Sequence, residues 1–124
     1  MKNQKSLLLS NYKKATIEML LLKMLSEDDM YGYQMAQELK KRSNGDYTIQ
    51  EGSMYPILYR LSDQAFITSY EKKVGIRQTR IYYHLEKAGY DYFQGLLESY
   101  YSYTNLIQFL LSSDTGDTFT EEIH

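Results

Sequence analysis

The sequence predicts a mostly α-helical fold with one small β-hairpin. Three segments with dense or helically spaced apolar residues occupy the first half of the 124-residue chain. Two alternating, β-prone segments joined around Gly75 follow them. The last segment, from Glu86 to about Ser112, has helical spacing and a second apolar stripe. This order predicts a winged helix-turn-helix followed by a long C-terminal dimerisation helix.

The first two helices are expected at about Asn11–Ser26 and Tyr31–Arg42. In the first, apolar residues cover more than one side, which indicates burial on several sides. In the second, apolar residues recur every four positions, and the cations Lys40–Arg42 occupy the last turn, where the helix dipole favours them. The polar stretch Ser43–Asp46 is typical of a turn that stops a helix.

A third helix is expected from Glu51 to Gln64, after the short β-prone stretch Tyr47–Ile49. Pro56 falls near its first or second turn, where a missing backbone N–H costs little. The segments Phe66–Val74 and Gln78–Leu85 then alternate and predict a two-stranded hairpin.

The last helix carries apolar residues at the spacing of a coiled-coil seam, which predicts association with a second copy. We therefore expect residues 1–85 to form the winged head, 86–112 the dimerisation helix and 113–124 a flexible tail. The seam consists of Phe93, Leu96, Tyr100, Tyr103, Ile107 and Leu110.

The amino-acid composition indicates the cellular compartment of the protein and the kind of partner it binds. The chain has no cysteine, and no apolar run approaches the roughly 20 residues of a membrane span, so a cytoplasmic protein is expected. Residues 1–85 hold 13 Lys and Arg against 9 Asp and Glu, whereas residues 86–124 hold 1 against 7. Local charge governs binding to a polyanion, so the basic excess of the head suits nucleic acid, although an ordinary mixed surface would give similar counts.

The sequence argues against an enzyme. Its two histidines are His84, in a predicted strand, and His124 at the end of the chain. No metal-spaced cluster, nucleophile motif or phosphate-binding loop accompanies them, so we expect no catalytic residues, no metal and no cofactor.

Three blocks of the chain resemble the PadR-type transcriptional regulators, in the short form whose C-terminal part is a single helix. The blocks are Tyr31–Tyr33, Ser53–Leu61, and Arg80–Leu85 followed by Gly89. The resemblance covers about residues 13–112. It implies a winged helix-turn-helix that dimerises through its last helix, with help from the first, and that usually represses transcription.

Three positions depart from the pattern of that family. Tyr59 stands where a basic residue is common, which removes one phosphate contact. Ala65 stands where glycine commonly ends the third helix, and Glu86 stands where threonine usually starts the last helix and caps it.

The third helix is the expected recognition helix, whose N-terminal side chains would meet base edges in the major groove. Gln50 can pair with adenine, Ser53 can contact several bases or a phosphate, and Gly52 permits close backbone approach. Tyr55 resembles the family tyrosine that meets the DNA backbone, although its spacing equally suits a core aromatic. Further candidates are the hairpin cations, which a solvated hairpin would also carry, and two lysines of the first helix: Lys72, Lys73, Arg77, Arg80, Lys13 and Lys14.

The resemblance also implies an apolar space between the first and last helices of two subunits, where family members sense small, often aromatic molecules. Tyrosine would offer stacking contacts, and Glu18 would favour a cation. At helical spacing the same residues would also serve as plain interface packing. The lining would comprise Glu18, Met19, Leu97, Tyr100 and Thr104.

We therefore expect a sequence-specific DNA-binding transcriptional regulator, a homodimeric repressor whose affinity for double-stranded DNA a small aromatic or cationic molecule modulates. The alternative is a winged-helix protein-interaction module or a small-molecule sensor that does not bind DNA. Salt dependence separates these functions, because binding through cations weakens with salt by a log-log slope of about −0.9 per neutralised phosphate.

Overall fold

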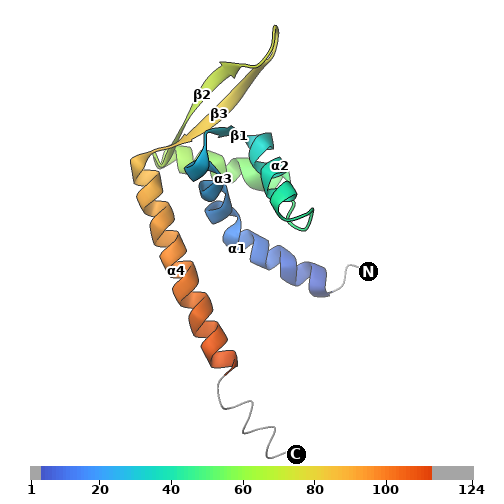
Figure 1. Cartoon of the computed structure of the whole chain (residues 1–124), viewed down its shortest axis with the longest axis vertical. Helices are drawn as coiled ribbons and strands as arrows, with labels where there is room; N and C mark the ends of the chain where they lie inside the picture. The colour runs from blue at the N-terminus through green and yellow to red at the C-terminus, as the bar shows by residue number, and fades with distance from the viewer. Residues whose placement is uncertain (1–3, 113–124) are drawn as a thin grey trace, which may run out of the picture. The chain divides into compact units, whose positions relative to one another are not determined.

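The computed structural model describes residues 4–112, without the side chains of residues 4–12, 14 and 15 (Figure 1). The expected tail, 113–124, lies outside this range. The chain divides into two compact units, Met1–Phe93 and Gln94–His124. The elements in chain order are α1 (Gln4–Glu27), β1 (Met30–Tyr31), α2 (Gly32–Arg42), α3 (Glu51–Asp63), β2 (Ile67–Lys73), β3 (Thr79–Leu85) and α4 (Lys87–Leu111).

The fold class predicted from the sequence is confirmed, and α2, α3, the hairpin and α4 begin and end close to the expected residues. The largest difference in a helix is the start of α1, which lies at Gln4 instead of Asn11. Leu7, Leu8 and Leu9 are good helix formers, but three adjacent leucines show no periodicity from which a helix could be predicted.

The hairpin belongs to a three-stranded antiparallel sheet in the order β1-β3-β2, not to the two-stranded sheet expected. The third strand is the pair Met30–Tyr31, with Met30 opposite Tyr83 and Tyr31 opposite Tyr82. The β-prone stretch Tyr47–Ile49 forms no strand. A two-residue strand is too short to show alternation, and it exists because the open edge of β3 offers backbone hydrogen bonds.

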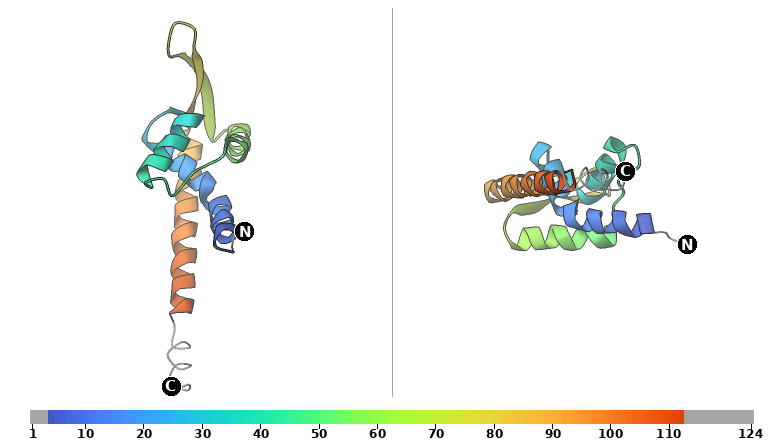
Figure 2. Two further views of the ribbon diagram at one scale, coloured as in Figure 1. Left: turned by 90° about the vertical axis from the view of Figure 1, so that its right-hand side faces the viewer. Right: turned by 90° about the horizontal axis from the view of Figure 1, so that it is seen from below.

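The first unit has a closed apolar core. Side chains of α1, α2, α3, the first turns of α4 and all three strands contribute to it, and Figure 2 shows the hairpin extending away from α1, α2 and α3. Phe93, which the sequence predicts in the dimerisation seam, is 3% exposed and belongs to this core. The fully buried side chains are Leu21, Leu22, Met24, Met35, Met54, Leu58, Leu61 and Ile67.

Two glycines permit close approaches inside this unit. A Cβ on Gly32 would lie 2.5 Å from the hydroxyl oxygen of Tyr55, so glycine lets that ring pack against the start of α2. A Cβ on Gly89 would collide with the backbone carbonyl oxygen of Phe66, so glycine lets the first turn of α4 pack against the chain before β2. The backbone at Phe66 cannot move aside as the Tyr55 side chain can, so a side chain is tolerated less at Gly89 than at Gly32.

The two junctions that depart from the family pattern each have a physical account. Ala65 follows α3 with φ +62°, and the bonds Phe66 N–H to Leu61 C=O (3.0 Å) and Ala65 N–H to Ser62 C=O (3.0 Å) form a Schellman turn. Alanine therefore adopts the left-handed conformation that glycine accepts without strain. Before α4, Glu86 accepts a hydrogen bond from the Thr68 hydroxyl at 2.7 Å, so its carboxylate ties the helix start to β2.

Candidate nucleic-acid interface

The N-terminus of α3 is exposed on the surface of the first unit. Gln50 has extended backbone, and its carbonyl accepts the N–H groups of Ser53 (3.0 Å) and Met54 (3.1 Å). The Gln50 and Ser53 side chains are exposed and make no hydrogen bond to other described residues. A Cβ on Gly52 would meet nothing within 4 Å, so packing does not require glycine there. These groups are free to contact a ligand.

The hairpin, or wing, carries four cations: Lys72 and Lys73 on β2, Arg77 in the turn, and Arg80 on β3. Within residues 4–112, no carboxylate lies within ion-pair distance of any of the four. At the tip, Ile76 is 98% exposed. The wing therefore presents positive charge that the described head does not neutralise.

Stacked tyrosines hold two of these cations in place. The Tyr82 ring packs edge-on against Tyr31 (5.4 Å between centroids) and is stacked with Tyr70 (5.7 Å). Lys72 Nζ lies 5.0 Å from the centroid of Tyr82, and the Arg80 guanidinium lies 4.2 Å from that of Tyr31. Cation–π contacts limit the freedom of both side chains, so the β1 and wing tyrosines position charge as well as filling space.

Of the two lysines predicted as DNA contacts on the first helix, only Lys13 has a described side chain. Lys13 Nζ donates to the Thr48 carbonyl at 3.0 Å and lies 5.5 Å from the centroid of Tyr47. It thus anchors the connection between α2 and α3, just ahead of the first turn of α3. The side chain of Lys14 lies outside the described residues.

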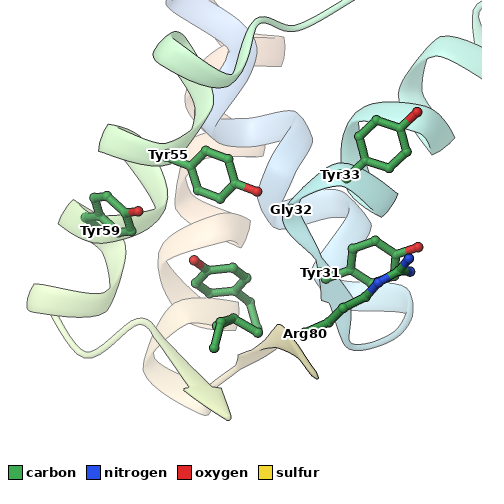
Figure 3. Close-up of a pocket in the computed structure, with 8 residues that line it drawn as sticks. Tyr31, Gly32, Tyr33, Tyr55, Tyr59 and Arg80 are labelled. Atoms are coloured by element: carbon green, nitrogen blue, oxygen red, sulfur yellow. The ribbon is translucent and has the colours of Figure 1, made fainter. Parts of the chain in front are cut away.

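A hollow of about 330 Å³ lies between α2, α3 and β3 (Figure 3). Tyr55, singled out from the sequence, lines it, half-buried against Gly32. Arg80, expected to bind phosphate, also lines it. Five of the chain's 14 tyrosines come together here, and no spacing in the sequence predicts that group. The remaining lining residues are Tyr31, Tyr33, Tyr59, Ile81 and Tyr83.

Glu18, expected to attract a cationic molecule, already has a cationic partner. Its carboxylate accepts a hydrogen bond from Arg60 of α3 at 2.8 Å and from the Tyr92 hydroxyl at 3.1 Å. The Tyr92 ring is stacked on Phe66 at 4.4 Å. Because Arg60 compensates its charge, Glu18 is less able to attract a cationic molecule than the sequence predicts. Glu18 instead links α1 to α3 and to the start of α4.

The other residues expected to line a ligand site fall in both units. Met19 belongs to the first unit with Glu18, whereas Leu97, Tyr100 and Thr104 belong to the second. The Thr104 hydroxyl donates to the Tyr100 carbonyl at 2.8 Å, a bond within its own helix. Large apolar side chains on this part of α4 are exposed, with Tyr103 at 65% and Leu110 at 56%.

A hydrogen-bonded cluster braces the base of the wing. Asp29, just before β1, accepts the Tyr70 hydroxyl at 2.7 Å and lies 2.7 Å from His84 Nδ1. The carboxylate raises the pKa of Tyr70 to about 12 and raises the pKa of His84 above its ordinary value. Although partial burial opposes it, these bonds and the charges of His84 and Lys72 lower the pKa of Asp29. The cluster holds the wing to the turn after α1.

Residues 4–112 contain no group of three or more His, Cys, Asp or Glu placed to hold a metal ion. None of the helices within that range is both long and apolar enough to cross a bilayer.

Residues 21–95 match the family described as "Transcriptional regulator PadR-like family". The chain belongs to this family. The matched range runs from the buried part of α1 to the first turns of α4 and so includes the tyrosine-lined hollow and the wing, whereas Glu18 lies just before it.

The chain is similar to a curated protein and to solved PadR structures over 66–87% of its length. "Uncharacterized protein X" of Lysinibacillus sphaericus is 26% identical over 95 residues, 77% of this chain and 87% of that protein. A PadR family transcriptional regulator from Eggerthella lenta has a TM-score of 0.78 at 23% identity, over 87% of this chain and 92% of that one. Bacillus subtilis PadR, solved in complex with operator DNA, has a TM-score of 0.60 at 22% identity, over 66% of this chain and 47% of that one. The two structures show that the fold is shared.

Proposed function

We propose that this PadR-like regulator is a homodimeric repressor that binds operator DNA through α3 and the wing. The observation that carries the proposal is a group of four cations gathered on the wing beside the exposed start of α3. Several helix cations, Arg42, Arg60 and Lys23, are paired with a carboxylate, whereas Lys40 and Lys41 at the end of α2 have no such partner among the described residues. The four wing cations have no carboxylate partner within residues 4–112. Unpaired cations beside an exposed recognition helix suit the phosphates of DNA.

Each side chain then has a distinct role. Gln50 and Ser53, with Gly52 allowing close approach, contact base edges in the major groove. Lys72, Lys73, Arg77 and Arg80 hold phosphates beside it. Lys13 acts indirectly, by fixing the connection that leads into α3. On an inverted repeat, two such heads address half-sites about 34–36 Å apart.

The second copy associates through α4. We propose that residues 86–112 serve as the dimerisation helix and residues 1–85 as the DNA-binding head. The exposure of Tyr103 and Leu110 supports this, because apolar side chains at seam spacing are stabilised by a partner helix. A small molecule bound beside Met19, Leu97, Tyr100 and Thr104 would change the separation of the two heads and hence the affinity for DNA. Since Arg60 compensates Glu18, a neutral aromatic molecule suits this site better than a cation.

Selection of binding sites from random DNA, followed by fluorescence anisotropy across a salt series, tests this function. Selective binding that weakens steeply with salt is expected. Arg77→Ala should lower both the affinity and the slope of log affinity against log salt, by about 0.9. Lys87→Ala is the matched control, because Lys87 is paired with Asp91 on α4 and should not alter the slope. Failure to enrich any DNA would contradict the proposal and favour a protein partner.

A further inference from the structure

The tyrosine-lined hollow combines aromatic walls with groups that can donate hydrogen bonds. Figure 3 shows the Tyr55 and Tyr59 rings projecting from α3 toward the side where Tyr31, Gly32 and Tyr33 lie. The Tyr55 and Tyr59 rings are tilted by 33° with centroids 6.1 Å apart. The hollow therefore joins the recognition helix to the start of α2 and, through Arg80, to the wing.

Three hydroxyls gather in this hollow without a protein acceptor. The Tyr83 side chain is 5% exposed, and no described residue within hydrogen-bond distance accepts its hydroxyl proton. The hydroxyls of Tyr55 and Tyr59 likewise make no hydrogen bond within residues 4–112. Burial, and then the proximity of Tyr59 and Tyr55, raises the pKa of Tyr83, so its hydroxyl remains a proton donor at neutral pH. The Tyr55 and Tyr83 oxygens keep some access to solvent, so an occupant with acceptor oxygens can take the place of water beside them.

The charge of the hollow indicates the kind of acceptor. The Arg80 guanidinium lies over Tyr31, and no residue of the described lining is acidic. Hydroxyl donors beside one cation suit an anion with several acceptor oxygens. The aromatic walls suit an apolar group attached to that anion. A deoxyribose with its phosphate has both features, and about 330 Å³ is enough to admit it.

We propose that this hollow binds one sugar–phosphate unit of the DNA backbone, with Tyr59, Tyr83 and Arg80 donating to the phosphate beside Tyr55. This rests on the proposed function, since the ligand belongs to the operator. Two of the new donors are neutral, so they add affinity without releasing counterions. The tyrosine part of the contact therefore differs from the contacts of Lys72, Lys73 and Arg77, because loss of the two hydroxyls lowers affinity at every salt concentration and leaves the salt slope unchanged.

The test replaces single phosphates of a selected operator by neutral methylphosphonates and measures each duplex against wild type and the double variant Tyr59→Phe/Tyr83→Phe. Phenylalanine keeps the ring and removes only the hydroxyl. On unmodified DNA, the double variant should bind at least about 10-fold more weakly, with the slope unchanged. At one phosphate in each half-site, the substitution should weaken wild type strongly and the double variant much less. Tyr90→Phe, an exposed tyrosine outside this hollow, is the matched control.

The possible results separate this inference from the proposed function. If wild type binds its operator and the folded double variant binds equally tightly, the hollow is not a phosphate site, while the DNA-binding function stands. The same conclusion follows if both proteins respond identically to every methylphosphonate. If wild type selects no DNA, both proposals fail. Thermal melting of the variants establishes whether they are folded, and Tyr59→Phe alone, at a 59% exposed position, tests the contact without altering the core.

Discussion

The two units of the chain differ in how far their apolar side chains are buried. In the first unit, side chains from three helices and the sheet enclose one another, and Leu21, Met54 and Leu58 are completely buried. In the second unit, one helix exposes tyrosines, leucines and a phenylalanine, with Phe109 at 66% and Leu111 at 79%. A single helix has no other element to bury its apolar side. The difference shows that the apolar side chains of the first unit are buried within its own fold, whereas many of those on α4 beyond Phe93 stay exposed in the single chain.

The strongest way to break the first unit is Gly89→Ala. The added Cβ meets the carbonyl of Phe66, which is backbone, so we expect a loss of about 3 kcal/mol in the free energy of unfolding. Urea denaturation measures it. Gly95→Ala is the matched control on the same helix, where a Cβ meets nothing within 4 Å, and it should stabilise the helix by about 1 kcal/mol. A loss at Gly95 as large as at Gly89 would mean that a partner packs closely there.

In the second unit, substitutions on the exposed side of α4 should weaken the proposed dimer rather than unfold the helix. Ile107→Glu/Leu110→Glu places charge on the exposed seam and should raise the dimer dissociation constant by about 30-fold or more, the effect of losing one strong interface contact. Analytical ultracentrifugation measures this constant. Gln108→Glu adds charge to an exposed position between them and should leave the dimer intact. A dimer unaffected by the double variant would place the interface elsewhere.

A smaller change should strengthen the head. Ala65 has φ +62°, so Ala65→Gly relieves a left-handed conformation and should raise the free energy of unfolding by about 1 kcal/mol. Ala88→Gly, in the first turn of α4, is the converse control, because glycine in a regular helix should cost about 1 kcal/mol. If denaturant melts showed that both substitutions change the free energy of unfolding in the same direction, the strain at Ala65 would be refuted.

The smallest expected effect is the pH dependence of the wing base. His84 is bonded to Asp29 and also near Glu86, and its pKa in the folded protein lies above the ordinary 6.5. Its contribution is therefore complete below pH 6.5 and is lost as pH rises through the raised pKa. The lowered pKa of Asp29 limits this window on the acid side, because protonation of Asp29 breaks the pair. Both groups are partly exposed, so the contribution should stay below about 1 kcal/mol.

His84→Gln measures that contribution. The difference in stability between wild type and His84→Gln should be largest near pH 6 and shrink toward pH 9. Tyr90→Phe, near the same surface but without a bond to Asp29, should show no such trend. A difference that grew with pH would contradict the assignment.

The sequence by itself determined the local elements and their order. Apolar spacing predicted α2 and α3, alternation predicted the hairpin, and seam spacing predicted α4, because these periods arise from the geometry of one helix or strand. Family resemblance pointed to Ala65 as a glycine position, and its positive φ agrees. The wing cations were also visible in the sequence, since exposed charge at a hairpin follows from the order of residues.

Tertiary structure alone decided how distant residues meet. The pairing of Met30 with Tyr83, the hydrogen bonds of Glu18 with Arg60 and Tyr92, and the tyrosine-lined hollow each join segments far apart in the chain. No local period encodes such contacts. They arise because packing the helices around a common core brings these polar groups together, and partly desolvated polar groups are stabilised when they find partners.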